Sequence, residues 1–213
     1  MQILVRQFRL DVSTPLQPRY NIAPTQDVAV VRATDAGQRE LVMMRWGLVP
    51  SWADELAIGN RMINARGETV AEKPSFRSAF KKRRCLVLAD GYYEWKQGTK
   101  PKQPYLFHFE DDRPFALAGL WETWAKGGVP VETCTIITTS PSPLSAAIHD
   151  RMPVILDDPA IDRWLDPQTT DATDIKQLIR PFEDPAFVID PVSTMVNSPT
   201  HEDPRCVEPT RLP

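Results

Sequence analysis

The sequence has few cysteines, no long apolar run and no leader-like start. Its three cysteines, Cys85, Cys134 and Cys206, are odd in number and far apart, which fits a reducing compartment and excludes a disulfide framework or a CxxC metal site. No stretch approaches the ~20 apolar residues that cross a bilayer. The first six residues carry no basic region followed by a long apolar segment, so we expect no signal peptide. These absences predict a cytoplasmic protein without a membrane partner.

Glycine is also scarce, with 9 residues against 21 prolines. Abundant proline favours short strands and stiff loops over long helices. Walker, GxGxxG, GxSxG and HExxH motifs are all missing, and the three histidines and three cysteines show no ligand spacing. We therefore expect no nucleotide, metal or other cofactor. No repeat or low-complexity linker divides the chain, which predicts one domain over 1–213.

Many short strands follow one another through tight turns, without a βαβ rhythm. This order predicts an α+β fold, with a mainly antiparallel sheet or open barrel and short flanking helices. The predicted helices cover 2–9, 69–82, 143–148, 159–165 and 171–180. The predicted strands cover 28–32, 40–46, 85–89, 92–96, 105–109, 115–120, 131–139, 152–156 and 186–189.

The net charge of −3 hides an uneven distribution. Residues 61–102 carry eleven Lys or Arg against four Asp or Glu, whereas 103–213 are strongly acidic. A local excess of +7 can form an anion-binding surface in an acidic protein. The alternative for 81–84, Lys-Lys-Arg-Arg, is a solvated helix end, where cations offset the helix dipole. Taken alone, the run 81–84 favours a solvated helix end over an anion-binding surface.

Two titratable residues are candidates for acid–base chemistry. Glu94 lies between Tyr93 and Trp95, where burial against aromatic rings would raise its pKa, although strand alternation alone favours a solvent-facing carboxylate. His149 precedes Asp150 and could transfer protons near neutral pH, although a lone histidine is more often structural. Each candidate is weak by itself.

Two tryptophans are candidates for stacking on unpaired bases. Trp46 and Trp52 bracket a proline-containing loop beside the basic segment, a combination suited to single-stranded nucleic acid. The alternative is that they are core residues, which we expect for Trp95 and Trp121. Cys85 lies in an apolar strand and is predicted to be a packing residue.

Taken together, these segments resemble the SOS-response-associated peptidase (SRAP) family, whose members process abasic sites and crosslink to DNA. The resemblance covers nearly the whole chain in the family's order. The matching stretches are PRYNIAPTQ (18–26), RWGLVPSWA (45–53), INARGETVAEKPSFR (63–77), RRCLVLADGYYEWK (83–96), KQPY (102–105), LAGLWE (117–122), IHDRMPVIL (148–156) and PVSTMVN (191–197). The resemblance implies a single α+β domain with a basic groove for single-stranded DNA.

The family's chemistry uses an N-terminal Cys in a start such as MCGRF, exposed once Met is removed. Its α-amine attacks the C1′ aldehyde of an abasic site, and its thiol closes a stable thiazolidine. An α-amine with a pKa of about 7.7–8.0 is partly unprotonated near neutrality. The resemblance implies that Asn64 positions the terminal residue and the sugar, Glu94 shuttles protons, and His149 assists ring opening or elimination. It implies DNA contacts by Arg66, Trp46 and Trp52.

The sequence departs from the family at position 2, which is Gln2. An internal cysteine has no free α-amine, so none of the three cysteines can replace the missing one. The start of the sequence looks like the helix after the family's first strand, so we expect that strand to be absent; a crosslink-dead paralogue is the alternative.

The function predicted by resemblance is an abasic-site crosslinking enzyme with lyase-type chemistry in the DNA damage response. The alternatives are a thiol autopeptidase, as the family name implies, or a non-enzymatic single-stranded-DNA-binding protein. The expected partner is single-stranded DNA with abasic sites. We expect a cytoplasmic monomer that associates with the nucleoid through DNA.

Overall fold

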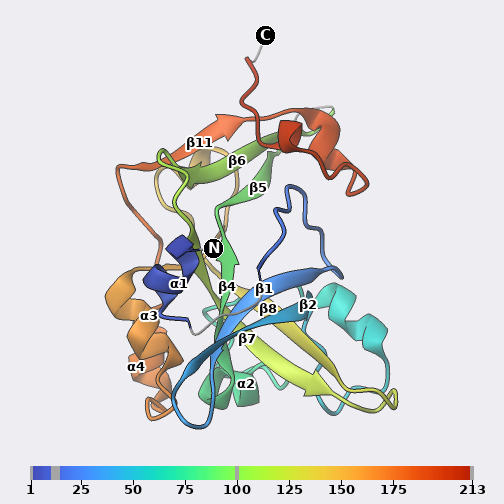
Figure 1. Ribbon diagram of the computed structural model, residues 1–213, viewed down its shortest axis with the longest axis vertical. Helices are drawn as coiled ribbons and strands as arrows, with labels where there is room; N and C mark the ends of the chain where they lie inside the picture. The colour runs from blue at the N-terminus through green and yellow to red at the C-terminus, as the bar shows by residue number, and fades with distance from the viewer. Residues whose placement is uncertain (1, 11–14, 99–100, 212–213) are drawn as a thin grey trace.

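A five-stranded barrel forms the centre of the computed structural model, which describes residues 2–10, 15–98 and 101–211 (Figure 1). The strands follow the order β7-β4-β1-β2-β8, and β8 pairs back with β7. They are β1 (Asp27–Ala33), β2 (Arg39–Trp46), β4 (Arg84–Ala89), β7 (Phe115–Trp124) and β8 (Val131–Thr139). All of these pairings are antiparallel except β2–β8. The predicted α+β class is confirmed.

The barrel is closed, a detail that the predicted mainly antiparallel sheet or open barrel did not include. Closure depends on β7, which is ten residues long. Its first half, Phe115–Leu120, pairs with β4. Its second half, from Gly119 to Trp124, pairs with β8. One long strand therefore joins both edges of the sheet, which leaves the barrel without a free edge.

A small second sheet lies above the barrel in Figure 1. It has the antiparallel order β11-β6-β5, from β5 (Gly91–Lys96), β6 (Gln103–Phe109) and β11 (Phe187–Pro191). Only Asp90 separates β4 from β5, so the chain passes directly from the barrel into the edge strand of the second sheet. Three short strands extend the barrel sheet: β3 (Asn64–Arg66), β9 (Met152–Pro153) and β10 (Ile155–Leu156).

The helices are short, as the proline content predicts. The α-helices are α1 (Gln2–Phe8), α2 (Arg77–Lys82), α3 (Asp158–Leu165) and α4 (Ala172–Lys176). The 3₁₀ helices are η1 (Leu56–Arg61), η2 (Ser145–Ala147), η3 (Thr194–Asn197) and η4 (Pro204–Cys206). The helix predicted over 69–82 forms only from Arg77, because Pro74 is tolerated only near a first turn. The helices predicted over 143–148 and 171–180 shorten to η2 and α4.

The strand predicted over 152–156 is divided at Val154. Its N–H donates to the carbonyl of Ile137 in β8, and its carbonyl accepts from Ala118 in β7. The segment therefore crosses from one barrel strand to the other at this residue, which is fully buried. An alternating pattern cannot reveal such a change of partner.

Two hydrophobic cores hold the barrel. The inner core includes Val30, Met44 and Cys85, which are fully or almost fully buried. The outer core lies beneath the helices, with Phe80 and Trp164 in edge-to-face contact. The packing role predicted for Cys85 is confirmed, and burial raises the pKa of its thiol. Cys134 and Cys206 are also buried.

Arg84 explains part of the basic run 81–84. Its buried guanidinium donates five hydrogen bonds to main-chain carbonyls at the ends of α2 and α3 and in the turn that follows. The acceptors are the carbonyls of Phe80, Lys81, Trp164, Asp166 and Thr169. Arg83, the residue before it, pairs with Glu122. These two arginines therefore stabilise the fold, and the solvated helix end of the alternative is limited to Lys81 and Lys82, which are exposed in the last turn of α2.

Candidate acid–base site

Glu94 and His149 face each other across the junction between the second sheet and the barrel. Glu94 is in β5, and His149 lies in the segment that follows η2. Glu94 Oε2 is 4.0 Å from His149 Nε2, and the two side chains are 26% and 30% exposed. The structure thus brings together two of the three predicted catalytic residues, which are 55 positions apart. The simpler alternative, a fully solvated Glu94, is wrong.

The environment of Glu94 favours its protonated form. Burial raises the pKa of its carboxyl, and the nearby Asp150 adds to the rise. His149 and the main-chain N–H of Trp95 act in the opposite direction and leave a net increase. A carboxyl with a raised pKa exchanges protons more readily near neutrality than an ordinary glutamate.

The main chain orients the His149 ring. The N–H of Arg151 donates to His149 Nδ1 at 3.1 Å, and Asp150 Oδ1 lies 3.3 Å from the same atom. Nδ1 also lies 3.2 Å from the carbonyl oxygen of Arg151, so the ring is fixed through contacts at Nδ1. Nε2 is left facing Glu94 Oε2 at 4.0 Å, which places the ring to exchange protons with the carboxyl.

Asn64 and Arg66 are in β3, which β8 separates from β9, the strand after His149. Asn64 is opposite Ile136 and Arg66 opposite Thr138 in the parallel pairing of β3 with β8. The strand that follows His149, β9, pairs with β8 at Thr138 as well. Both side chains are exposed and carry no side-chain hydrogen bond to other described residues. A shared cleft of Asn64 with the Glu94–His149 pair stays a prediction.

Arg151 is a site residue that our sequence reasoning missed. Its guanidinium donates to Glu68 Oε1 and Oε2 at 3.1 and 2.9 Å. It also donates to the hydroxyl and the carbonyl of Thr138 at 3.1 and 2.7 Å. The side chain is thereby held next to Arg66, two residues after His149. The signal in the sequence that could have identified Arg151 is its place two residues after the candidate His149.

The two tryptophans predicted to stack on bases differ in their surroundings. Trp46 is half-buried, packs against the inner core, and donates its indole N–H to the carbonyl of Ile63 at 2.8 Å. Trp52 is 52% exposed. Trp52 is therefore open to solvent, whereas Trp46 is held against the inner core. Trp95 and Trp121, which were expected to be core residues, are only half-buried at the edges of hydrophobic clusters.

The +7 segment does not form one continuous surface. Lys81 and Lys82 end α2, which precedes β4, whereas Glu94 lies beyond the other end of β4. Six strand residues span about 20 Å, and Figure 1 shows α2 and the second sheet at opposite ends of the barrel. Arg83 and Arg84 serve the fold, and Lys100 lies outside the described residues. Arg66 remains beside the site, joined there by Arg151 from outside the segment.

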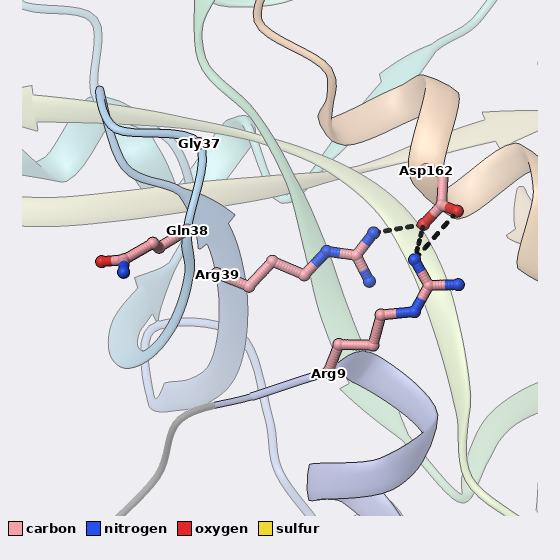
Figure 2. Close-up of a pocket in the computed structure, with 5 residues that line it drawn as sticks. All are labelled: Arg9, Gly37, Gln38, Arg39 and Asp162. Atoms are coloured by element: carbon pink, nitrogen blue, oxygen red, sulfur yellow. Dashed lines mark hydrogen bonds and ion pairs between the residues drawn. The ribbon is translucent and has the colours of Figure 1, made fainter.

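A separate hollow of about 440 Å³ lies between α1, β2 and α3. Figure 2 shows Arg9 and Arg39 pointing at Asp162, with which both form ion pairs. Arg39 also donates to the carbonyl of Phe8. The carboxylate already occupies both guanidinium groups, so the hollow fastens α1 to the barrel and does not resemble a substrate site.

The described residues contain no group of three or more His, Cys, Asp or Glu that could hold a metal ion. Within the same ranges, none of the helices is long and apolar enough to cross a membrane.

Comparison with known proteins identifies relatives along nearly the whole chain. A crystal structure of a Bacteroides thetaiotaomicron protein aligns with a TM-score of 0.78 at 30% identity, covering 88% of this chain and 82% of that one. The chain is 42% identical over 210 residues to abasic site processing protein YoqW of Bacillus subtilis (strain 168), covering 96% of this chain and 93% of YoqW. It is 39% identical over 228 residues to abasic site processing protein HMCES of Gallus gallus, covering 92% and 67%.

The fold is therefore shared with solved structures, and the sequence with proteins named for abasic site processing. Residues 2–199 match the SOS response associated peptidase (SRAP) family. The chain belongs to this family, as its motifs predict.

Proposed function

We propose that the protein processes abasic sites in single-stranded DNA, with Glu94 and His149 as its acid–base pair. The observation that carries the proposal is the 4.0 Å approach of the two side chains, together with the raised pKa of Glu94. The relatives named as abasic site processing proteins support the substrate class.

The chemistry of an abasic site needs such a pair. Its ring-opened form carries an aldehyde at C1′. Attack by an amine forms a carbinolamine, which gains a proton and loses water to become an imine. A protonated Glu94 carboxyl can supply that proton and recover one from the amine, and His149 can return it. Asn64 would hold the sugar beside the pair.

Closure of a thiazolidine needs a thiol and an α-amine on one residue. Cys85, Cys134 and Cys206 are internal and buried, so none of them can provide both groups. Burial also withholds them from a thiol peptidase reaction. The crosslinking step is therefore assigned to an N-terminal Cys of the kind that the family resemblance implies.

DNA binding is assigned to the exposed cations beside the pair and to the exposed ring of Trp52, which lies beside Lys126 in the turn after β7. Arg66 and Arg151 would contact phosphates, because a guanidinium that binds a carboxylate with two nitrogens also fits a phosphate. Trp52 would stack on a base. Trp46 would support the loop that joins the two tryptophans. The partner is single-stranded DNA.

The test uses the printed chain with single-stranded DNA that contains an abasic site, and with tetrahydrofuran-site DNA as the control without an aldehyde. Borohydride traps an imine as a band on a denaturing gel. We expect trapping on abasic DNA only, reduced at least tenfold in Glu94→Gln and His149→Gln. His108→Gln, a matched change at a histidine that pairs with Asp190, should leave trapping unchanged. Equal trapping in all three variants would overturn the assignment.

A further inference from the structure

Glu94 lies on a strand that is held on one side only. β5 is at the edge of the second sheet and, among the described strands, pairs with β6 alone, where Glu94 is opposite Tyr105. No other described strand forms a ladder of hydrogen bonds with β5, so its position is less constrained than that of a central strand. The place of the Glu94 carboxyl therefore depends on what holds its two neighbours.

Both neighbours of Glu94 are bound on the opposite face of β5, as strand alternation requires. Tyr93 donates its hydroxyl to the carbonyl of Tyr20 at 2.7 Å. Trp95 donates its indole N–H to Asn197 Oδ1 at 2.6 Å. Each bond connects β5 to a segment remote in sequence, and neither partner belongs to the second sheet.

Asn197 is itself fixed in orientation. It ends η3, and its amide Nδ2 donates to the carbonyl of Lys102 at 3.2 Å. Because the amide nitrogen is engaged there, the amide oxygen faces the Trp95 indole. The residues before it are anchored too, since Val192 and Val196 are buried and the N–H of Val192 donates to the carbonyl of Pro104.

The segments that hold Tyr93 and Trp95 are joined to each other. The buried amide of Asn21 donates to the carbonyls of Val196, Ser198 and His201 at 3.0–3.3 Å. The Glu202 carboxylate accepts hydrogen bonds from the main-chain N–H groups of Tyr20 and Asn21. One hydrogen-bonded support, formed by residues 19–21 and 192–202, thus lies behind β5.

Trp95 connects this support to the carboxyl of Glu94. Trp95 directly follows Glu94 in β5, and its indole is held by Asn197. We propose that Asn197 is a positioning residue for Glu94, acting through Trp95. Asn197 fixes the indole, the indole fixes the edge strand at the residue beside Glu94, and the strand keeps the carboxyl 4.0 Å from His149.

The test follows the His149 ring by NMR as a function of pH, in the full chain and without DNA. The chain has three histidines, so His→Gln variants can assign the ring signals. Asp150 and the Arg151 N–H also face His149 and are unchanged in every variant. Glu94→Gln removes the nearby carboxylate, so the His149 curve should move to lower pH.

We expect Asn197→Ala to move the His149 curve in the same direction by at least a third of the Glu94→Gln displacement. Trp95→Phe, which keeps the ring and removes the indole N–H, should do the same. In a Glu94→Gln background neither change should add a displacement, because both act through the carboxyl. Asn197 is exposed, so alanine leaves the core intact. Asn60→Ala, another exposed asparagine, is the matched control.

An unmoved His149 curve in Asn197→Ala would overturn the proposal. So would a displacement that persists in the Glu94→Gln background, because it would reach His149 by another route. Since the measurement uses no DNA, its failure is distinct from a failure of the proposed abasic-site chemistry.

Discussion

Arg151 lies two residues after His149, and its guanidinium donates hydrogen bonds to both carboxylate oxygens of Glu68, at 3.1 and 2.9 Å. This arrangement matches the way an arginine binds a phosphate. The pairing lowers the pKa of the Glu68 carboxyl, so the carboxylate stays ionised at neutral pH. Glu68 therefore occupies the position that a DNA phosphate would take on Arg151.

Removing the charge of Glu68 should strengthen DNA binding. Glu68→Gln should raise affinity for single-stranded DNA severalfold at low salt, because a phosphate no longer competes with a carboxylate. The slope of log K against log salt should steepen by about 0.7, one added phosphate contact. Fluorescence anisotropy across a salt series measures both. Glu72→Gln removes the same charge from an exposed pair with Lys176 and should have a smaller effect; equal effects would contradict a specific role for Glu68.

Arg66 and Trp52 should contribute to binding in different ways. Arg66→Ala should weaken binding and reduce the salt slope by about 0.7, since one phosphate contact is lost. Trp52→Ala should weaken binding by about 1–3 kcal/mol with an unchanged slope, because stacking releases no counterions. The same anisotropy series separates the two. Salt-independent binding would contradict a DNA surface at this site.

Glu94 should destabilise the folded protein at neutral pH. Its pKa is raised by burial, so folding favours the protonated form. The stabilising contribution is present below the unfolded-state pKa of about 4.3 and is lost as pH rises through the folded-state value. Glu94→Gln resembles the protonated carboxyl. Its melting temperature should exceed that of the wild type at pH 7, and the difference should vanish below about pH 4. A gain that stays constant with pH would contradict the raised pKa.

Arg84 should be worth more to stability than Arg83. Arg84→Met leaves five carbonyls without their donor, and we expect a loss of about 3 kcal/mol or more in the free energy of unfolding. Arg83→Met removes an ion pair in which the two side chains are 25% and 11% exposed, and it should cost less than Arg84→Met because one carboxylate, not five carbonyls, loses its donor. Urea unfolding measures both. Equal losses would show that Arg84 does not join α2 to α3.

The sequence predicted the elements whose patterns are local. Hairpin strands such as β1 and β2 are marked by alternation and by the turn between them. The closure of the barrel was not predictable in this way, because it depends on β7 serving two partners along its length. Val154 illustrates the same limit, since its change of strand leaves no periodic signal.

The candidate site was predicted through motifs more than through spacing. Glu94 and His149 are weak candidates alone, and their approach is set by the passage from β4 into β5. Arg151 and Glu68 are 83 positions apart in the sequence. The two motifs that contain them therefore gave no indication that these side chains form an ion pair. The sequence leaves Trp46 open between a stacking surface and the core, because ring type and charge do not reveal its bond to Ile63.

The most direct measurement is the formation of a heat-stable adduct with abasic single-stranded DNA. The chain should be made with Met-Cys-Gly-Arg placed before its first residue, the start that the family resemblance implies, and beside it a Met-Ser-Gly-Arg version. On a denaturing gel without borohydride, we predict a heat-stable adduct from the Cys version, much reduced by Glu94→Gln. The printed chain and the Ser version should give none, because neither has an N-terminal thiol. A heat-stable adduct from the printed chain, or none from the Cys version, would contradict the account.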